Sequence, residues 1–300
     1  MTDSPRPPIS VRQNTERAQR FLAAQSRLYT DAKRLHDTRF LTVVLLAAVT
    51  VTVALAFPEA RVVVGAVGGA TTFLWSLLGG GREKRCRKQA AFTQEEFDTY
   101  VFDLPWNVMA AEHPSPTLIV EAANRYQGNR TKDWYPDTGA VERPLDILIC
   151  QRSNLGWGAS IHRFYGAVLT GCLVVLVLLG VAIALIGDLN ATDALVSLVV
   201  PLLGPARELI EMIRSNRDSS ETKAKAEMKV HRLWEQALRP GSAITVSDCR
   251  AVQDLILGIR QTNAHVPDWL DNLRRSHSET LMQQSAEHLV EEALRQGKAR

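Results

Sequence analysis

The sequence lacks the short motifs that mark the common hydrolases and nucleotide-hydrolysing enzymes. None of GxxxxGK[ST], HExxH, GxSxG or paired CxxC occurs in the 300 residues. The three glycines at 79–81 do not follow a strand, so they do not match a phosphate-binding loop. We therefore predict that the protein is not an enzyme and that it requires no cofactor.

Cysteine is scarce, and its spacing excludes two further classes. The four cysteines are scattered without ligand spacing: Cys86, Cys150, Cys172 and Cys249. A disulfide framework or a zinc centre is therefore not expected. The histidine pairs His277/Glu279 and His288/Glu291 fall on a charged helical face that is typical of a solvated surface, so we predict no metal site.

Net charge is also small, with 35 Lys and Arg residues against 32 Asp and Glu residues, a balance of +3. This excess is too small to indicate nucleic-acid packaging, so neither DNA nor RNA is an expected partner. The first apolar run starts only at residue 40 and has no small-residue cleavage pattern after it, so a secretory signal peptide is not expected.

Long uncharged runs are present instead, and they come in two pairs. Phe40 to Phe57 is uncharged over 18 positions, and Val62 to Gly81 over 20. Phe164 to Gly187 is uncharged over 24 positions, and Ala194 to Ala206 over 13. Crossing a hydrocarbon core takes about 20 helical residues. The short connections within each pair predict two membrane hairpins.

The last of these runs is short and contains Pro201 and Pro205. Proline inside lipid requires neighbouring helices or water to satisfy the freed backbone groups, which favours a kinked helix within a bundle. A re-entrant or interfacial segment is the alternative, and it would place the C-terminal third on the opposite side of the membrane.

Basic residues cluster at one set of helix ends. The connections 58–61 and 188–193 contain Arg61 and three acidic residues. The opposite ends carry ten basic residues: Lys33, Arg34, Arg39, Arg82, Lys84, Arg85, Arg87, Lys88, Arg163 and Arg207. By the positive-inside rule, both termini and the middle segment are expected in the cytoplasm.

The expected fold is an all-α membrane protein with four transmembrane helices as two hairpins, and with mainly helical cytoplasmic middle and C-terminal regions. The expected organisation, in chain order, is an amphipathic helix within 1–39, a hairpin at 40–81, a middle region at 82–163, a second hairpin at 164–206 and a C-terminal region at 207–300. In the last region, Ser247 is the expected N-cap of a helix that ends near Gln261.

Polar and aromatic residues gather next to the predicted inner membrane surface. Arginine, amide and aromatic side chains of this kind recognise phosphates and nucleobases. The candidate ligand-binding residues are Arg12, Gln13, Asn14, Gln25, Tyr29, Lys33, Trp106, Trp134, Tyr135, Gln151, Arg152, Asn154, Arg163 and Tyr165. The alternative is that the aromatics fill a core or an interface belt while the arginines contact lipid headgroups.

Gly65 and Gly69 form a GxxxG pattern in the second run. Small residues at this spacing let helices approach closely in membranes. The pattern serves both self-association into a homo-oligomer and packing within one protomer, and the sequence leaves both open.

Several of these segments together resemble a known family. They are RQN, AAQSRLYTDAK, FDLPWN, DWYP, CQRSNLGW, VQDLILGIR, VPDW and LRR, in this order from Arg12 to about Glu292. The string resembles the SMODS-associating four-transmembrane effectors of bacterial cyclic-oligonucleotide anti-phage signalling. Two positions depart from the family pattern: Gly158 stands where an acidic residue is common, and Asp271 and Asn272 stand where a tyrosine is favoured.

The resemblance implies a pore-forming effector of the bacterial inner membrane that binds a cyclic di- or oligonucleotide. A partner cyclic-nucleotide synthase would make this ligand, and opening the pore would arrest the infected cell in abortive infection. Membrane lipid and further copies of the chain are the other expected partners. The alternatives are a membrane-anchored enzyme or a scaffold with an unrecognised cytoplasmic site.

Overall fold

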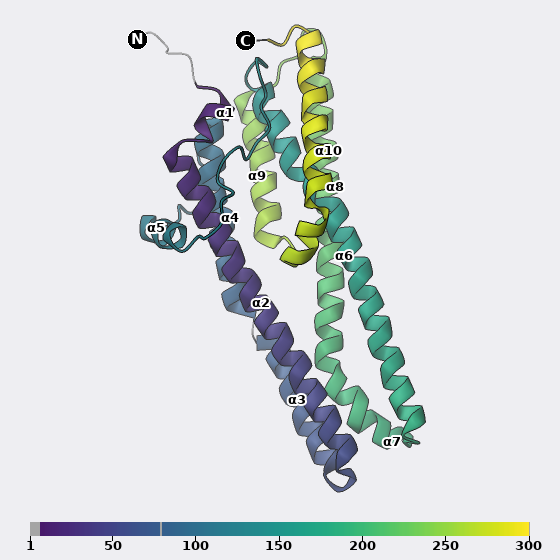
Figure 1. Cartoon of the computed structure of the whole chain (residues 1–300). Coiled ribbons are helices and arrows are strands. Elements are labelled where there is room, and N and C mark those ends of the chain that lie inside the picture. Colours follow the sequence, from purple (N-terminus) through teal and green to yellow (C-terminus); the bar gives the residue numbers. More distant parts are fainter. Residues whose placement is uncertain (1–6, 79, 300) are drawn as a thin grey trace. The chain divides into compact units, whose positions relative to one another are not determined.

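The computed structural model of the protein describes residues 7–78 and 80–299, and helices make up most of them (Figure 1). Residues 1–6 of the predicted N-terminal segment and Gly79 of the first predicted hairpin lie outside the described residues. The α-helices are α1 (Ile9–Arg12), α2 (Glu16–Ala56), α3 (Arg61–Leu78), α4 (Gly80–Phe102), α5 (Pro116–Asn124), α6 (Leu145–Ile186), α7 (Ala191–Ala194), α8 (Val200–Leu238), α9 (Val246–Thr262) and α10 (Asp268–Arg295).

Two short elements complete this set. They are the 3-10 helix η1 (Pro58–Ala60) and the π-helix η2 (Leu195–Val199). Within the described residues, β-structure is limited to one isolated bridge between Val141 and Ala299. The predicted all-α class is confirmed.

The chain divides into two compact units. The first comprises residues Met1–Thr30, Cys86–Ile161 and Ser219–Arg300, and the second comprises Asp31–Arg85 and His162–Asp218. Helices α2, α4, α6 and α8 each contribute residues to both units.

The core of the first unit draws on all three of its chain segments. Hydrophobic residues recur at helical spacing, for example Phe97 and Val101 on α4, so each helix turns one apolar face inward. Buried core residues from the different helices include Leu22, Phe97, Leu148, Trp234, Ile256 and Leu289. The indole nitrogen of Trp234 donates to Glu292 Oε2 at 2.8 Å, which ties α8 to α10.

Helix α9 begins two residues earlier than the sequence suggested. Thr245, and not Ser247, is the N-cap: its side chain accepts from the backbone N–H of Asp248, and the Asp248 carboxylate accepts from the Thr245 N–H at 2.8 Å. This reciprocal pair is a capping box. The prediction of Ser247 as the cap was wrong because Asp248 completes the box only when Thr245 occupies the cap position.

Apolar side chains cover the outer face of the second unit. Leu41, Leu45 and Val49 on α2 are exposed, as are Val175 and Leu178 on α6. Within residues 7–78 and 80–299, three helical segments are long and apolar enough to cross a membrane: Glu16–Ala56, Pro58–Phe102 and Leu145–Ile186. Outward-facing apolar surface on such helices is typical of a bundle in lipid.

Small residues bring α3 close to the helical segment η2–α8. A Cβ atom on Gly65 would overlap the backbone of Val196, and one on Gly69 would lie 2.5 Å from Val200 Cγ1. Gly204 of α8 is also close to α3, because a Cβ atom on this glycine would lie 2.6 Å from Thr72 Cγ2. The GxxxG pattern therefore lies at a contact between helices of the same chain.

Candidate functional site

A buried charged network forms the polar centre of the first unit. Asp98 of α4 is fully buried and accepts three hydrogen bonds: from Tyr135 Oη at 2.6 Å, from Gln253 Nε2 at 2.7 Å and from Arg260 Nη1 at 2.5 Å. These donors come from the 126–144 segment and from α9. A buried carboxylate requires this degree of pairing because desolvation of an unpaired charge is costly.

Glu95 lies one turn before Asp98 and extends the network. It accepts from Arg250 Nη2 at 2.6 Å and from Gln253 Nε2 at 2.8 Å. Arg250 also contacts Asp254 at 2.8 Å and donates to the carbonyl of Pro105 at 3.1 Å. Three acids, Glu95, Asp98 and Asp254, are thus brought together with two arginines, Arg250 and Arg260.

Burial perturbs the titration of this centre. Desolvation and the neighbouring Asp98 raise the pKa of Glu95. Desolvation also raises the pKa of Tyr29 to about 12, and burial together with Asp98 raises the pKa of Tyr135 well above its usual value. Burial by itself lowers the pKa of Arg260. The neighbouring Asp98 carboxylate and the other acidic groups raise that pKa by more, so the net shift is upward.

Four predicted ligand-binding residues join this network. Tyr135 bonds Asp98, and Asn154 Nδ2 donates to Tyr135 Oη at 2.6 Å. Gln13 exchanges hydrogen bonds with the backbone of Tyr135, at 2.7 and 3.1 Å. Gln151 donates to Gln253 Oε1 at 3.1 Å and to the carbonyl of Cys249 at 2.8 Å. Gln13, Tyr135 and Gln151 are buried, so they tie helices together in this state.

Three other predicted residues surround the network. Asn14 donates to Asp133 Oδ1 at 2.8 Å. The ring centroid of Trp134 lies 6.4 Å from that of Phe97. Tyr29 donates to Gln94 Oε1 at 3.4 Å.

The remaining predicted residues of the first unit lie apart from Asp98. Arg12 stacks over the ring of Tyr100, Gln25 donates to Ser26, and Trp106 stacks on His113. Arg152 donates to Ser285 Oγ at 2.6 Å.

Lys33, Arg163 and Tyr165 belong to the second unit. Tyr165 is buried and Arg163 is exposed on α6. The fourteen predicted residues are thus distributed over both units, and their joint role in ligand binding stays a prediction.

The second unit has its own buried ionic cluster. Arg39 of α2 contacts Glu208 of α8 at 2.5 Å and Glu83 of α4 at 3.5 Å. Arg39 and Arg207 both donate to the carbonyl of Ser76, at 3.3 and 3.1 Å. The cluster joins α2, α3, α4 and α8 in a region where unpaired charges are expensive.

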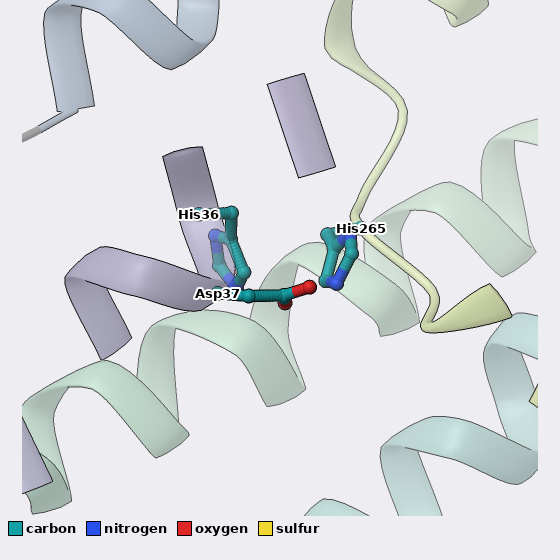
Figure 2. Close-up of side chains that lie close together, drawn as sticks. All are labelled: His36, Asp37 and His265. Carbon is teal, nitrogen blue, oxygen red and sulfur yellow. The ribbon is translucent and has the colours of Figure 1, made fainter. Parts of the chain in front are cut away.

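His36 and Asp37 of α2 come shortly before Arg39 of this ionic cluster in the sequence. Figure 2 shows the side chains of His36 and Asp37. His36 Nδ1 lies 3.3 Å from Glu83 Oε2, so it extends the ionic cluster. His265, also labelled in Figure 2, belongs to the first unit, in the connection between α9 and α10.

The sequence analysis missed five polar members of the first network, four of them charged: Glu95, Asp98, Arg250, Arg260 and the neutral Gln253. The signal was present in the VQDLILGIR segment, where Gln253 and Arg260 share a helical face with Arg250. On α4, Glu95 and Asp98 are three residues apart and also share a face. Acids and bases on facing helices of an otherwise apolar core predict such pairs.

Position 158, where the sequence departs from the family pattern, is buried beside Lys223. The Lys223 side chain fills the space that a Cβ atom at Gly158 would occupy. An acidic side chain at this position would therefore face an ammonium group on α8.

Fold and site together define the class. The protein is a helical membrane protein in which the first unit is built around buried, paired charges and the second unit is apolar on its surface. The family model described as the SMODS-associating 4TM effector domain matches residues 7–289, and the chain belongs to this family.

A curated relative supports the same assignment. It is a probable CBASS effector molecule of Bacillus cereus (strain VD146), 24% identical over 296 residues that cover 90% of this chain and 94% of that protein. No solved structure matches the chain significantly. The resemblance seen in the sequence is thus confirmed, and the protein is an anti-phage membrane effector of a family defined by effector function and not as an enzyme class.

Proposed function

We propose that the protein binds a cyclic di- or oligonucleotide on the cytoplasmic side of the bacterial inner membrane and opens a pore in response. The ligand would come from a cyclic-nucleotide synthase, and several copies of the chain would enclose the pore. Loss of the membrane barrier would arrest the infected cell. Catalysis has no part in this mechanism.

The main support for this proposal is that the first unit is built from three separate segments of the chain. Three chain segments share one core, so all three must lie on the same side of a membrane. The chain therefore crosses an even number of times between Thr30 and Cys86, and again between Ile161 and Ser219. Since α6 is long and apolar enough to cross, we infer that the segment α7–η2–α8 returns across the membrane. This parity favours four spans as two hairpins over a re-entrant fourth segment.

The basic helix ends support the orientation. Arg39, Glu83, Arg207 and Glu208 meet at one end of the second unit, and Arg61 pairs with Asp193 at the other at 2.6 Å. The first end carries most of the basic flanking residues, so the positive-inside rule favours a cytoplasmic first unit with both termini.

Continuous helices provide the coupling. Because α2, α6 and α8 run from residues of one unit into residues of the other without a break, a displacement of their ends in the first unit is transmitted along a stiff element. No relay protein is required.

The paired arginines suggest how a ligand acts. Phosphate oxygens bind guanidinium groups as carboxylates do, so a phosphate-bearing ligand would compete with Glu95 and Asp98 for Arg250 and Arg260. Changing a closed-to-open ratio from 99:1 to 1:99 requires about 5.5 kcal/mol of differential binding. Each charge-assisted contact contributes about 1.5 to 3 kcal/mol, so several contacts are needed.

Leakage from liposomes tests the proposal. Purified protein is reconstituted with a trapped dye, and cyclic di- and trinucleotides are added singly. We expect one of them to release the dye, and Arg152→Ala and Arg163→Ala to abolish the response while insertion is retained. Arg20→Ala, which changes an exposed arginine paired with Glu16 of the same helix, is the matched control. Wild-type leakage in both test variants would defeat the sensing role of these arginines, and no release by any nucleotide would defeat the pore.

A further inference from the structure

A groove opens on the surface of the second unit, between α2 and α3. Its volume is about 460 Å³. The residues that line it are Asp31, Arg34, Leu35, Thr38, Arg39, Thr42 and Trp75. All of them belong to the second unit, and the groove takes no part in the charged network around Asp98.

The groove straddles the boundary between charged and apolar sequence. On α2, Arg39 is the last charged residue before the uncharged run that starts at Phe40. On α3, Trp75 lies near the end of the run that starts at Val62, and Arg39 donates to the neighbouring Ser76 carbonyl, so both runs end at the same level. Tryptophan and arginine at such a level are typical of the interface between hydrocarbon and headgroups.

The two ends of the groove differ in chemistry. Arg34 is exposed and forms no ion pair within the part of the chain that the structure describes, whereas Arg39 is engaged by Glu83 and Glu208. Besides these arginines, the lining residues Leu35 and Trp75 expose apolar side chains. A cation beside an apolar wall matches a phosphate joined to an acyl chain.

We propose that this groove binds an anionic glycerophospholipid. The phosphate lies against Arg34, and one acyl chain lies along Leu35 and Trp75. Because Glu83 and Glu208 already engage Arg39, Arg34 is the cation of the groove that is available to a headgroup with one negative charge, such as phosphatidylglycerol. A lipid is the favoured source of this phosphate because the groove continues onto the exposed apolar face of α2, at Leu41 and Leu45.

Native mass spectrometry of the full chain in detergent tests the site, with phosphatidylglycerol or phosphatidylcholine added. We expect phosphatidylglycerol to bind at least tenfold more tightly, and Arg34→Gln to remove about that factor because one charge-assisted contact is lost. Trp75→Leu should weaken both lipids. Arg20→Gln makes the same charge change on the same helix outside the groove and should leave binding unchanged.

Three results would overturn the proposal. The first is equal binding of the two lipids, or phosphatidylglycerol binding that Arg34→Gln leaves intact. The second is displacement of the lipid by millimolar inorganic phosphate, which would make the groove a site for free phosphate. The third is a disulfide between two chains carrying Thr38→Cys in lipid-free detergent, which would make the groove an interface between copies. Because Arg34 is exposed, its variant is expected to fold, and an unchanged circular dichroism spectrum checks this.

Discussion

At the scale of single residues, the chain separates charges that are exposed from charges that are buried and paired. Arg20 and Glu16 form an exposed pair on α2, and such pairs contribute about 0 to 1 kcal/mol. Asp98 and Arg260 are buried together, and removing one member of a buried pair leaves the other uncompensated. The difference predicts which substitutions the fold tolerates.

Asp98→Asn is expected to lower the free energy of unfolding of the first unit by about 3 to 5 kcal/mol, because Arg260 would keep its charge without its partner. Urea unfolding in detergent, followed by the fluorescence of buried Trp234, measures the change. Glu16→Gln is the control and should change stability by less than about 1 kcal/mol. Equal effects of the two substitutions would show that the buried pair is unimportant.

Alkaline pH should destabilise the first unit. Burial raises the pKa of Tyr29 from 10.0 to about 12 and that of Cys249 from 9.0 to about 12. The unfolded chain therefore releases these protons first. Their contribution to stability is complete below pH 9 and is lost as the pH rises toward 12, at up to about 1.4 kcal/mol per pH unit for each group.

Unfolding free energies measured between pH 8 and 11.5 test this slope. Tyr29→Phe removes one titrating group and should flatten the slope above pH 10 by about one proton. A slope identical to that of the wild-type protein would mean that Tyr29 titrates normally in the folded state.

The sequence predicted chemistry at this scale only in part. It identified Tyr135, Asn154, Gln13 and Gln151 as polar residues of interest, and the structure brings these four together. The spacing of Glu95 and Asp98 on one helical face indicated a polar patch on α4, but it did not identify their partners. The contacts of Asp98 link α4, α9 and the 126–144 segment, and such pairing depends on tertiary packing that local spacing does not encode.

At the scale of elements, small residues determine how closely helices approach. Gly69→Ala is expected to destabilise the second unit by about 1 to 3 kcal/mol, because the added methyl group would meet the Val200 backbone at 2.9 Å and a helix must shift. Thermal unfolding in detergent, followed by circular dichroism, measures the loss.

Gly171→Ala is the matched control for this change. Gly171 lies on α6 with open space around its Cβ position, so the same methyl group should be tolerated or slightly stabilising. If both substitutions have the same effect, helix propensity and not close packing accounts for the result at Gly69.

Helix existence was easier to predict than helix boundaries. The uncharged runs predicted α3 and the second half of α2 and α6, because apolar length is a local property. The predicted boundary between the second hairpin and the C-terminal region, at 206/207, falls inside α8, which begins at Val200 and contains Pro205. The π-helix η2 before it lets Pro201 and Pro205 fall within a continuous helical path, an accommodation that spacing alone does not reveal.

At the scale of the whole molecule, the account depends on one chain forming a shared core from three separate segments. Composition located the apolar runs, but it could not show that residues near 20, 97 and 256 pack together. That packing is the support for the proposed fourth span, in place of a re-entrant segment. The proposed pore and its control by a cytoplasmic ligand both depend on this topology.

Cysteine accessibility tests that topology most directly. The four native cysteines are replaced by alanine, and single cysteines are placed at Glu59, Asn129, Thr192 and Ala243, all exposed positions. A membrane-impermeant maleimide is then applied to intact spheroplasts. The account predicts labelling at positions 59 and 192 only, with 129 and 243 labelled after permeabilisation. Labelling of position 243 from outside, or protection of position 192, would contradict it.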